Sequence, residues 1–432
     1  MVHSDEHKVY KYVHLNVSII EKQKLEQFNH WWIKEKVDKE LALPFKREKY
    51  SLVENLLEKK FIIALVGLRR TGKTTIMYQL IEKLLEKNKK ENIFFFSFDD
   101  NFFSIEEVIE SYKEFQNKDL REEKCYIFLD EIQKCRNWEN SLKKYYDLYP
   151  KLKFVISSSE SLFVKKKTKE TLAGRIFEIF LKPFSFKEFV LFKGKKEMKY
   201  ETEIKPLFLE YINKGGFPES FSLNEKKFDE YIKSLVVDKI VYKDIPKLFR
   251  IEDPDLVKIL LEIISTNPGV YIDYQSLAKQ LGRDRRVIKN YIFYLENSFL
   301  IKLLGNYRKT KISTLRKRKK AYPTDISLIK IYKKEFGDEF LGKIIETLIV
   351  NHLDSTFFWT EKSEVDIVKD EIPIEIKYQN KIDDSDFKGL IDFMKKFDKK
   401  EGILISKNEE KEIFIKDKKI QIIPAWKFLL GF

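Results

Sequence analysis

The chain has 432 residues, 43% of them hydrophobic, and a net charge of +14, which together predict a globular protein of roughly two to four domains. No apolar run approaches the length of a membrane span, and residues 1–11 are charged without the apolar core of a secretory signal, so we expect no membrane association. With only Cys125 and Cys135, a disulfide framework is excluded and a cytoplasmic location is expected.

Residues 1–44 are predicted to form a charged helical N-terminal extension. The adjacent side chains of Trp31 and Trp32 are expected to be exposed on it. For both tryptophans, packing within the chain is favoured over a partner site.

A phosphate-binding loop follows the apolar, strand-length run at residues 61–66. Residues 67–74 read Gly-Leu-Arg-Arg-Thr-Gly-Lys-Thr, the pattern G-x-x-x-x-G-K-[ST], and residues 75–86 have helical apolar spacing. In such a loop the amides and the helix N-terminus face a phosphate, Lys73 reaches the β- and γ-phosphates, and the Thr74 hydroxyl ligates Mg²⁺. The alternative is a glycine turn before a helix. The predicted ATP contacts here are Gly67, Arg69, Arg70, Thr71, Gly72, Lys73, Thr74 and Thr75.

An acidic pair, Asp130 and Glu131, follows the apolar strand predicted at residues 125–129. Ligands bind at the carboxyl edge of a parallel sheet, where this pair would lie. Asp130 is expected to hold Mg²⁺ through water, and Glu131 to polarise the attacking water as the general base. The alternative is an acidic pair that complements a helix dipole.

A third strand, residues 153–156, ends in three serines. Either Ser157 or Ser158 suits a sensor of the γ-phosphate, and Ser158 is assigned to the site; a plain serine turn is the alternative. Arg69, Arg70 and Arg175 are candidates for stabilising the transferred phosphoryl charge, from the same chain or from a neighbouring subunit of a possible homo-oligomer. Each arginine could instead be an ordinary surface residue.

The basic charge is concentrated in residues 271–320, which hold fourteen basic and three acidic residues. In this region residues 255–265, 273–281 and a segment beginning at Asp284 have helical spacing, with Gly282 at the turn, and residues 299–304 and 315–322 are expected to form two strands. This order predicts a winged helix over residues 251–325 that contacts DNA through residues 283–320. The alternative is a winged helix that serves only for protein packing. Residues 190–250 are expected to be helical and to act as a lid or connector.

The last part of the chain, residues 326–432, carries a second chemical pattern. A helix at 342–350 contains Glu346, a strand at 364–368 contains Asp366, and a strand at 372–377 ends in Glu375-Ile-Lys377. Alternation places Glu375 and Lys377 on one strand face, where Asp366 and Glu346 can converge to hold Mg²⁺ while Lys377 stabilises the attacking water. This matches the D…E-x-K core of restriction-endonuclease-like nucleases. The alternative is a solvated polar face of an edge strand.

Several of these motifs occur together in a known family. The set resembles the prokaryotic AAA-type ATPases that carry a C-terminal domain of unknown function with a restriction-endonuclease-like core, over roughly residues 45–405. The resemblance implies ATP binding and hydrolysis, a winged-helix middle and a nuclease-like end. One departure is Thr347, which follows Glu346 at the position where the family usually has the asparagine of a Glu-Asn pair. The matching segments are residues 67–75, 130–133 with Trp138, 157–159, 172–175, 183–189 and 215–219.

The combined prediction is an α/β chain with a P-loop NTPase parallel sheet in residues 45–189, then a winged helix, then a small α/β nuclease-like domain. We expect an ATPase with ATP and Mg²⁺ as ligands that couples nucleotide state to the winged helix and the nuclease-like domain. The predicted catalytic residues are Glu131, Asp366, Glu375 and Lys377, and the predicted metal ligands are Thr74, Asp130, Glu346, Asp366 and Glu375. The alternative is a slow nucleotide switch that acts as a regulatory adaptor and has an inactive nuclease fold.

Overall fold

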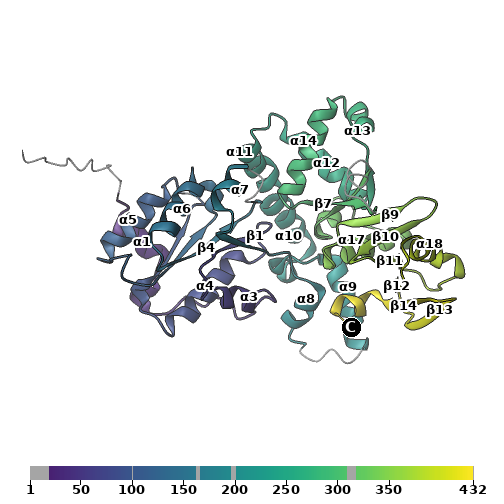
Figure 1. Ribbon diagram of the computed structural model, residues 1–432, viewed down its shortest axis with the longest axis horizontal. Coiled ribbons are helices and arrows are strands. Elements are labelled where there is room, and N and C mark those ends of the chain that lie inside the picture. Colours follow the sequence, from purple (N-terminus) through teal and green to yellow (C-terminus); the bar gives the residue numbers. More distant parts are fainter. Residues whose placement is uncertain (1–18, 100, 162–165, 196–200, 309–317, 432) are drawn as a thin grey trace, which may run out of the picture. The chain divides into compact units, whose positions relative to one another are not determined.

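The structure is a computed structural model that describes residues 19–99, 101–161, 166–195, 201–308 and 318–431 (Figure 1). The chain divides into two compact units. Unit 1 holds residues 1–65, 74–158 and 162–179, and unit 2 holds residues 66–73, 159–161 and 180–432. The phosphate-binding loop therefore belongs to unit 2, although the strand before it lies almost wholly in unit 1 and the helix after it lies there from Thr74 onward.

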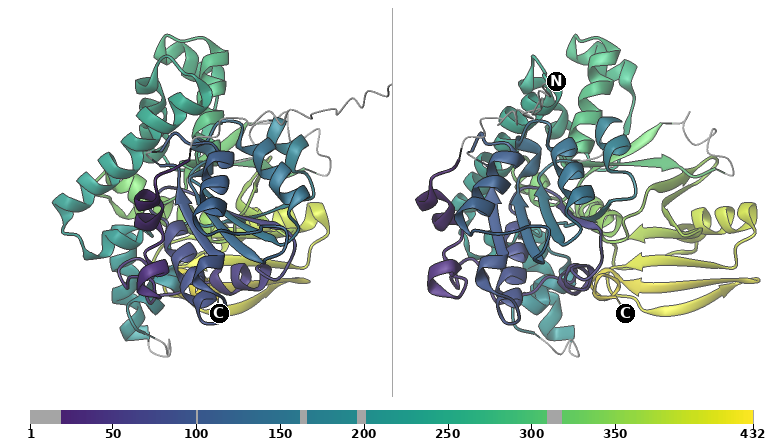
Figure 2. Two further views of the ribbon diagram at one scale, coloured as in Figure 1. Left: turned by 90° about the vertical axis from the view of Figure 1, so that its left-hand side faces the viewer. Right: turned by 60° about the vertical axis from the view of Figure 1, so that its left-hand side comes forward.

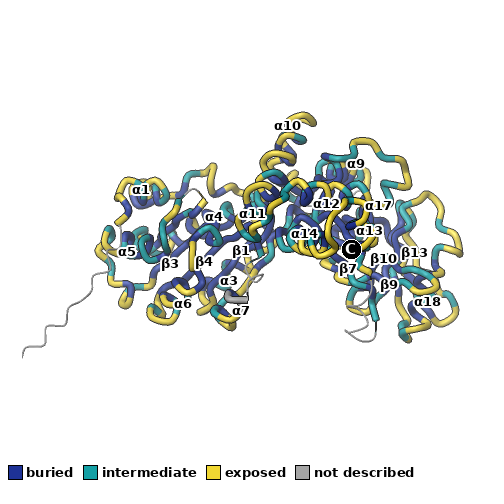
Figure 3. Tube along the Cα trace, turned by 90° about the horizontal axis from the view of Figure 1, so that it is seen from above, coloured by how far each residue is buried: buried dark blue, intermediate teal, exposed yellow. Residues whose placement is uncertain are grey.

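Unit 1 is built on a sheet that has five strands within the described residues, in the order β2-β3-β4-β1-β5. Strands β2, β3 and β4 pair in parallel, and every residue of β1, β3 and β4 is buried, as Figure 3 shows for β3 and β4. Parallel strands are covered on both faces, which explains their continuous apolar runs. The predicted α/β fold with a P-loop NTPase sheet is confirmed. The strands are β1 (Ile62–Val66), β2 (Ile93–Ser97), β3 (Cys125–Asp130), β4 (Leu152–Ser158) and β5 (Ile176–Phe180).

Seven α-helices occur among the described residues of the chain up to residue 179. Both indoles predicted to be exposed are buried: Trp31 and Trp32 donate their ring N–H groups to the Ile93 carbonyl at 3.1 and 3.0 Å. The prediction of exposure was wrong because tryptophan packing depends on neighbours far along the chain. The helices are α1 (Lys22–Phe28), α2 (Trp31–Lys34), α3 (Tyr50–Leu56), α4 (Lys73–Leu85), α5 (Ile105–Phe115), α6 (Trp138–Leu148) and α7 (Lys166–Leu172).

The connector of unit 2, residues 180–250, is mainly helical in its described part, as was expected for residues 190–250. It includes two π-helical stretches, Tyr231–Val237 and Ile240–Asp244, which run into the next helix without a break. Such wide turns inside helices are rare and often mark functional positions. The α-helices of the connector are α8 (Phe186–Phe192), α9 (Glu201–Lys214), α10 (Glu225–Glu230) and α11 (Ile245–Phe249).

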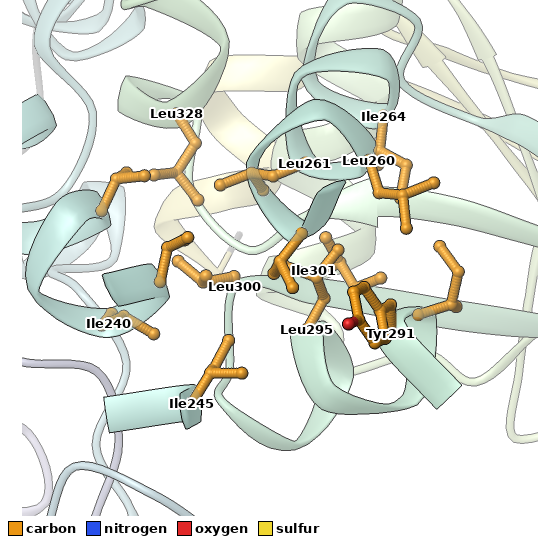
Figure 4. Packing of buried hydrophobic residues seen from close by; sticks show 14 of the residues in the cluster. Ile240, Ile245, Leu260, Leu261, Ile264, Tyr291, Leu295, Leu300, Ile301 and Leu328 are labelled. Carbon is orange, nitrogen blue, oxygen red and sulfur yellow. The ribbon is translucent and has the colours of Figure 1, made fainter. Parts of the chain in front are cut away.

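The middle of unit 2 has the order helix, strand, helix, helix and two antiparallel strands. The side chains of Asp273 and Asp284 cap helices α13 and α14, and Gly282 ends α13 with a φ of 61°. Apolar side chains from these helices, from β7 and from the connector gather in one cluster (Figure 4). The elements are α12 (Pro254–Thr266), β6 (Val270–Ile272), α13 (Tyr274–Leu281), α14 (Arg285–Asn297), β7 (Ile301–Asn306) and β8 (Lys319–Pro323).

Strands β6 to β8 continue into the C-terminal part, because β7 pairs in parallel with β9, with Gly305 beside Phe357. The resulting sheet has nine strands within the described residues, in the order β13-β14-β12-β11-β10-β9-β7-β8-β6, and β9 to β14 lie side by side in Figure 2. The strands are β9 (Phe357–Thr360), β10 (Glu364–Lys369), β11 (Ile372–Lys377), β12 (Glu401–Ser406), β13 (Lys411–Ile415) and β14 (Lys418–Pro424); the helices are α16 (Ser327–Lys330), α17 (Asp338–His352), α18 (Lys388–Phe397) and α19 (Ala425–Leu430).

Candidate functional site

The phosphate-binding loop has the backbone that its glycines predict. Gly67 has a φ of +148°, and a Cβ atom there would come within 2.2 Å of the Leu181 carbonyl oxygen. The Leu181 amide in turn donates to the Val66 carbonyl at 2.7 Å, and Gly72 has a φ of +90°. A side chain at Gly67 would therefore be excluded both by conformation and by close backbone approach.

Lys73 is buried and folded back on its own loop. Its Nζ atom donates to the carbonyl oxygens of Gly67 at 3.0 Å and Leu68 at 2.8 Å, while the Thr71 hydroxyl also donates to the Leu68 oxygen at 2.9 Å. These carbonyls satisfy an ammonium group that would be costly to bury alone. Phosphate oxygens are stronger acceptors for an ammonium than neutral carbonyls and can take these bonds over.

Asp130 ends β3 in unit 1 and accepts hydrogen bonds from two hydroxyl groups. The Thr74 hydroxyl donates to its two carboxylate oxygens at 3.1 and 3.2 Å, and the Ser157 hydroxyl forms a short bond to its Oδ1 atom. Hydroxyl and carboxylate oxygens are the ligands that Mg²⁺ prefers. The residues at this edge therefore fit the predicted magnesium ion, with Thr74 and Asp130 as its protein ligands.

Glu131 is held beside the same cluster. It is buried, with a left-handed φ of 53°; its amide donates to the Ser157 hydroxyl at 3.0 Å, and Gln133 Nε2 donates to its Oε2 atom at 2.5 Å. A non-glycine residue in this conformation is uncommon and is often found at functional positions. The arrangement fixes the direction in which the Glu131 carboxylate points.

Ser157, rather than the assigned Ser158, is the serine that the structure brings to Asp130. Both serines are buried at the end of β4. The register pairs Leu129 with Ile156, so one residue further along the strands Asp130 lies beside Ser157. Since consecutive side chains of a strand point to opposite faces, the parallel register could have identified Ser157. The role of Ser158 stays a prediction.

The three candidate arginines all have carboxylate partners. Arg69 forms two bonds to Asp244, at 2.6 and 2.7 Å, and the pair is largely buried. Arg70 Nη1 lies 2.7 Å from Glu219 Oε2 in a more exposed pair. These two partners come from the connector of unit 2.

Arg175 corrects one expectation. It bonds to Asp147 at 2.9 and 3.2 Å, and its carbonyl accepts the amide of Ile62, the first residue of β1. The phosphate-binding loop follows the last residue of β1, so Arg175 lies at the opposite end of that strand. A contact from Arg175 to a nucleotide in the same chain is therefore not supported, whereas a contact to a neighbouring subunit stays a prediction.

The described part of the basic segment 283–320 exposes fewer basic side chains than its composition predicted. Lys302 pairs with Asp354, and Lys320 is 2% exposed, so that neither can serve as a free phosphate contact. Arg308 pairs with Glu361, and Arg283 pairs with Asp253. Residues 309–317, which hold four of the basic residues, lie outside the described residues. The described basic residues that stay exposed on or beside helices α13 and α14 are Lys279, Arg283, Arg285, Arg286 and Lys289.

A second carboxylate cluster lies in the C-terminal part of unit 2. Glu346, on α17, is buried and accepts a bond from the Tyr322 hydroxyl at 2.5 Å and from Lys343 Nζ at 2.8 Å. Lys320 Nζ lies 3.7 Å from Glu346 Oε1, 4.0 Å from Asp366 Oδ1 and in a short bond to Glu364 Oε1. The helix and strands predicted around these residues are confirmed, but Lys320 was assigned to the surface and not to this cluster.

Asp366 and Glu375 share one face of the sheet. The antiparallel register pairs Ile367 with Ile374, so the next pair outward sets Asp366 opposite Glu375. Asp366 Oδ2 accepts the Ile376 amide at 2.9 Å, and Lys377 Nζ lies 3.0 Å from Glu375 Oε1. The predicted convergence of these side chains is therefore found.

Burial and mutual repulsion control the protonation of this cluster. Burial raises the pKa of Glu375 well above its usual value, and the nearby Asp366 charge raises it further. Burial and the charge of Glu346 likewise raise the pKa of Asp366. For Glu346, burial by itself acts to raise the pKa, but the charges of Lys320 and Lys343 hold it below its usual value.

The predicted metal set in this cluster is not supported. Within the described residues, no group of three or more histidine, cysteine, aspartate or glutamate side chains has a geometry that could hold a metal ion. Glu346 and Asp366 instead face the ammonium of Lys320, which presents N–H donors where a metal would need lone pairs. Glu346, Asp366 and Glu375 therefore do not fit a divalent ion in this arrangement, because a lysine lies among them.

Two family models match parts of the chain. Residues 59–190 match a model described as an AAA domain, and residues 205–335 match a domain of unknown function, DUF8612. The first match covers the phosphate-binding loop and strands β1 to β5, in agreement with the ATPase-like fold of this region. The second covers most of the connector and the segment from α12 to β8.

A curated relative and two solved structures are similar to the chain. An uncharacterized protein of Methanocaldococcus jannaschii is 27% identical over 415 residues, covering 86% of this chain and 88% of that protein. The Thermotoga maritima RuvB Holliday junction branch migration motor has 18% identity and a TM-score of 0.31, covering 60% of this chain and 89% of that one. AMPPCP-bound DnaA from Aquifex aeolicus has 14% identity and a TM-score of 0.31, covering 59% and 88%.

In the part of the chain that the structure describes, no helix has both the length and the apolar character required to cross a membrane.

Proposed function

We propose that this chain binds and hydrolyses ATP at residues 67–75 and couples the nucleotide state to unit 2. The support is the phosphate-binding loop, the oxygen cluster around Asp130, and the AAA-domain match of residues 59–190. Lys73 would exchange the carbonyls of its own loop for the β- and γ-phosphates. Mg²⁺, held by Thr74 and Asp130, would supply positive charge to the phosphates.

Glu131 is the proposed general base. Its amide is fixed by Ser157 and its carboxylate by Gln133, which keeps the side chain in one orientation. One carboxylate oxygen would accept the proton of the attacking water as the phosphoryl bond breaks. Ser157 bridges Asp130 and Glu131, so its hydroxyl would position both groups together.

The single observation that carries the coupling is the attachment of the phosphate-binding loop to the connector. Leu68 is 1% exposed and belongs to the apolar core formed by the connector and helices α12 and α14. Its neighbours Arg69 and Arg70 bond to Asp244 and Glu219 of the same connector. A phosphate that reorganises residues 67–73 must therefore act on residues of the connector.

This route continues toward the C-terminal part. Glu219 lies in the segment Gly215-Gly-Phe-Pro-Glu219, in which the Gly216 amide donates to Asp325 Oδ2 at 3.0 Å. A Cβ atom at Gly215 would come within 2.2 Å of Asp325 Oδ1, so this segment fits closely against Asp325, two residues after the end of β8. The DNA-binding role proposed for the segment from α12 to β8 would be the output of this coupling, through the exposed arginines of α14.

The second candidate is a slow nucleotide switch that acts as a regulatory adaptor with an inactive nuclease fold. Lys320 favours it, because the cluster that would bind the catalytic metal is filled by an ammonium group. A basal ATPase rate that DNA increases would support the first candidate, and slow turnover unaffected by DNA would support the second.

The experiment is ATP turnover by the full chain with no DNA, with single-stranded DNA and with double-stranded DNA. Lys73→Ala should abolish or severely weaken nucleotide binding, because the ammonium opposite the phosphates is lost. Lys83→Ala is the matched control, since Lys83 lies on the same helix but is exposed and pairs with Glu86. Nucleotide binding that survives Lys73→Ala unchanged would contradict the ATPase proposal.

A further inference from the structure

Lys320 is a buried lysine that enters the carboxylate cluster from a different part of the chain. It lies on β8, earlier in the chain than Glu346, Glu364, Asp366 and Glu375, and only 2% of its side chain is exposed. Its ammonium bonds to Glu364 and lies within 4.0 Å of Glu346 and Asp366. The rings of Tyr271 and Phe358 lie on its flanks, with centroids 5.7 and 5.3 Å from Nζ.

The strand register explains why the lysine reaches this point. Lys320 pairs with Tyr271 on β6 and with Leu304 on β7, so its strand is fixed on both sides. Tyr322, two residues along β8, points to the same face and donates to Glu346. One face of β8 thus supplies both a cation and a hydroxyl donor to the carboxylates.

The environment of Lys320 meets the needs of one cation. Burying an ammonium group is strongly unfavourable unless its charge and its N–H donors are both satisfied. Here three carboxylates and two aromatic faces surround it, and Tyr271 also donates to Glu364 at 2.6 Å. Mg²⁺ requires oxygen ligands at about 2.0–2.1 Å in an octahedral shell, and an ammonium group among the same oxygens prevents that shell from forming.

One further atom points into the cluster. Glu375 Oε2 is buried and, within the described residues, has no hydrogen-bond partner. Its other oxygen pairs with Lys377, so Oε2 is an oxygen next to Asp366 that is available to ligate a cation. This atom is separate from the three carboxylates that contact Lys320.

We propose that Lys320 is the resident cation of this cluster and takes the place of a divalent metal. While the Lys320 ammonium occupies the cluster, the cluster holds no divalent ion. The ion pairs of Lys320 also link β8 to the helix and strand that carry the carboxylates. Removing the ammonium group turns Glu346, Glu364, Asp366 and Glu375 into a site for a divalent cation. The proposal is independent of ATP hydrolysis and of the phosphate-binding loop.

The test is Mn²⁺ binding to the nucleotide-free full chain. Binding is measured as the decrease in the electron paramagnetic resonance signal of free Mn²⁺. Lys320→Met keeps the length of the side chain and removes its charge, so it should gain one Mn²⁺ per chain that the unchanged protein does not bind. Adding Asp366→Asn to that variant should abolish the gain. Lys343→Met is the matched control, since Lys343 also bonds to Glu346 but is about half exposed.

Thermal unfolding gives a second readout. Mn²⁺ should raise the melting temperature of Lys320→Met by several degrees, because a ligand that binds only the folded state stabilises it, and should not change that of Lys343→Met beyond the unchanged protein. If Lys320→Met does not fold, the double variant Lys320→Met with Glu364→Gln, which removes one charge of each sign, replaces it and should show the same gain.

Two results would overturn the proposal. The first is a Mn²⁺ ion bound by the unchanged protein and lost in Asp366→Asn. The second is a folded Lys320→Met protein, or its double variant, that gains no Mn²⁺ site. Failure of ATP hydrolysis in any of these proteins bears only on the function proposed above, since Mn²⁺ binding is measured without nucleotide.

Discussion

The two carboxylate clusters of this protein differ in the groups that the structure shows bonded to them. In unit 1, Asp130 accepts bonds from the hydroxyls of Thr74 and Ser157, which are neutral. In unit 2, Glu346 and Asp366 lie within 4.0 Å of the Lys320 ammonium. A hydroxyl can rotate and offer its oxygen to a metal, whereas an ammonium group has no lone pair to offer. Acidic residues at strand ends therefore identify a metal site only when the counter-charge is also known.

The largest expected effect tests the cluster around Asp130 and Glu131. Glu131→Gln should keep ATP binding but lower kcat by about 10²–10⁴-fold, because the amide cannot accept a proton from water. Asp366→Asn, a change in the lysine-filled cluster, is the control and should leave ATP turnover unchanged. The measurements are steady-state phosphate release and nucleotide titration. Wild-type turnover in Glu131→Gln would refute the assignment of the general base and remove the functional contrast between the clusters.

The next effect concerns a carboxylate that an arginine neutralises. Asp244→Asn removes the carboxylate charge that pairs with the largely buried guanidinium of Arg69, and breaking such a buried pair costs about 3–5 kcal/mol in the free energy of unfolding. Glu219→Gln is the matched control, since the Arg70–Glu219 pair is exposed and is worth roughly 0–1 kcal/mol. Chemical denaturation of both variants gives the comparison. Equal losses would show that burial does not distinguish the two contacts of the phosphate-binding loop.

A third case is Asp325, a buried carboxylate that accepts the amides of Gly216 at 3.0 Å and Ser327 at 2.8 Å. Burial raises the pKa of Asp325 to about 6, while the side chain and amide of Ser327 and the amide of Gly216 act to lower it. A raised carboxyl pKa contributes stability that is complete below the ordinary value of 3.8 and is lost as the pH rises through 6. The loss is at most about 3 kcal/mol.

The variant Asp325→Asn removes this titration. The unfolding free energy of the unchanged protein should therefore exceed that of Asp325→Asn by more at pH 4 than at pH 7, and the difference should be constant above pH 7. Urea denaturation at several pH values measures it. A difference that grows as the pH rises would mean that the folded protein favours the charged carboxylate, as in a cluster neutralised by lysine.

The smallest effect concerns the exposed arginines at the start of α14. If the exposed arginines contact DNA phosphates, changing Arg285 and Arg286 to serine should reduce the salt dependence of DNA binding by about 0.9 in slope for each lost contact. Lys302→Ser is the control, because Lys302 already pairs with Asp354. Fluorescence anisotropy over a salt series gives the slopes. Equal slopes for all proteins would leave the segment from α12 to β8 as a packing module.

Local sequence patterns were sufficient for much of the fold. The phosphate-binding loop, the strand that ends in Asp130, and the helices α13 and α14 are defined by neighbours within a few residues, so spacing and residue type identify them. The strands that carry Asp366 and Glu375 were also found, since alternation and the D…E-x-K spacing are local. What these patterns could not show is which residues from elsewhere lie against them.

Only the tertiary structure decided the partners. A run of lysines and arginines has the same composition whether its side chains meet solvent or carboxylates, so Lys320 could not be told from its neighbours until the register of β8 set its face. The pairing of Arg69 with Asp244 joins residues far apart in the chain, and no spacing rule links them. Sequence by itself determined where the chemistry-bearing residues lie along the chain, whereas packing determined the charge that each one faces, because electrostatic partners depend on distance in space.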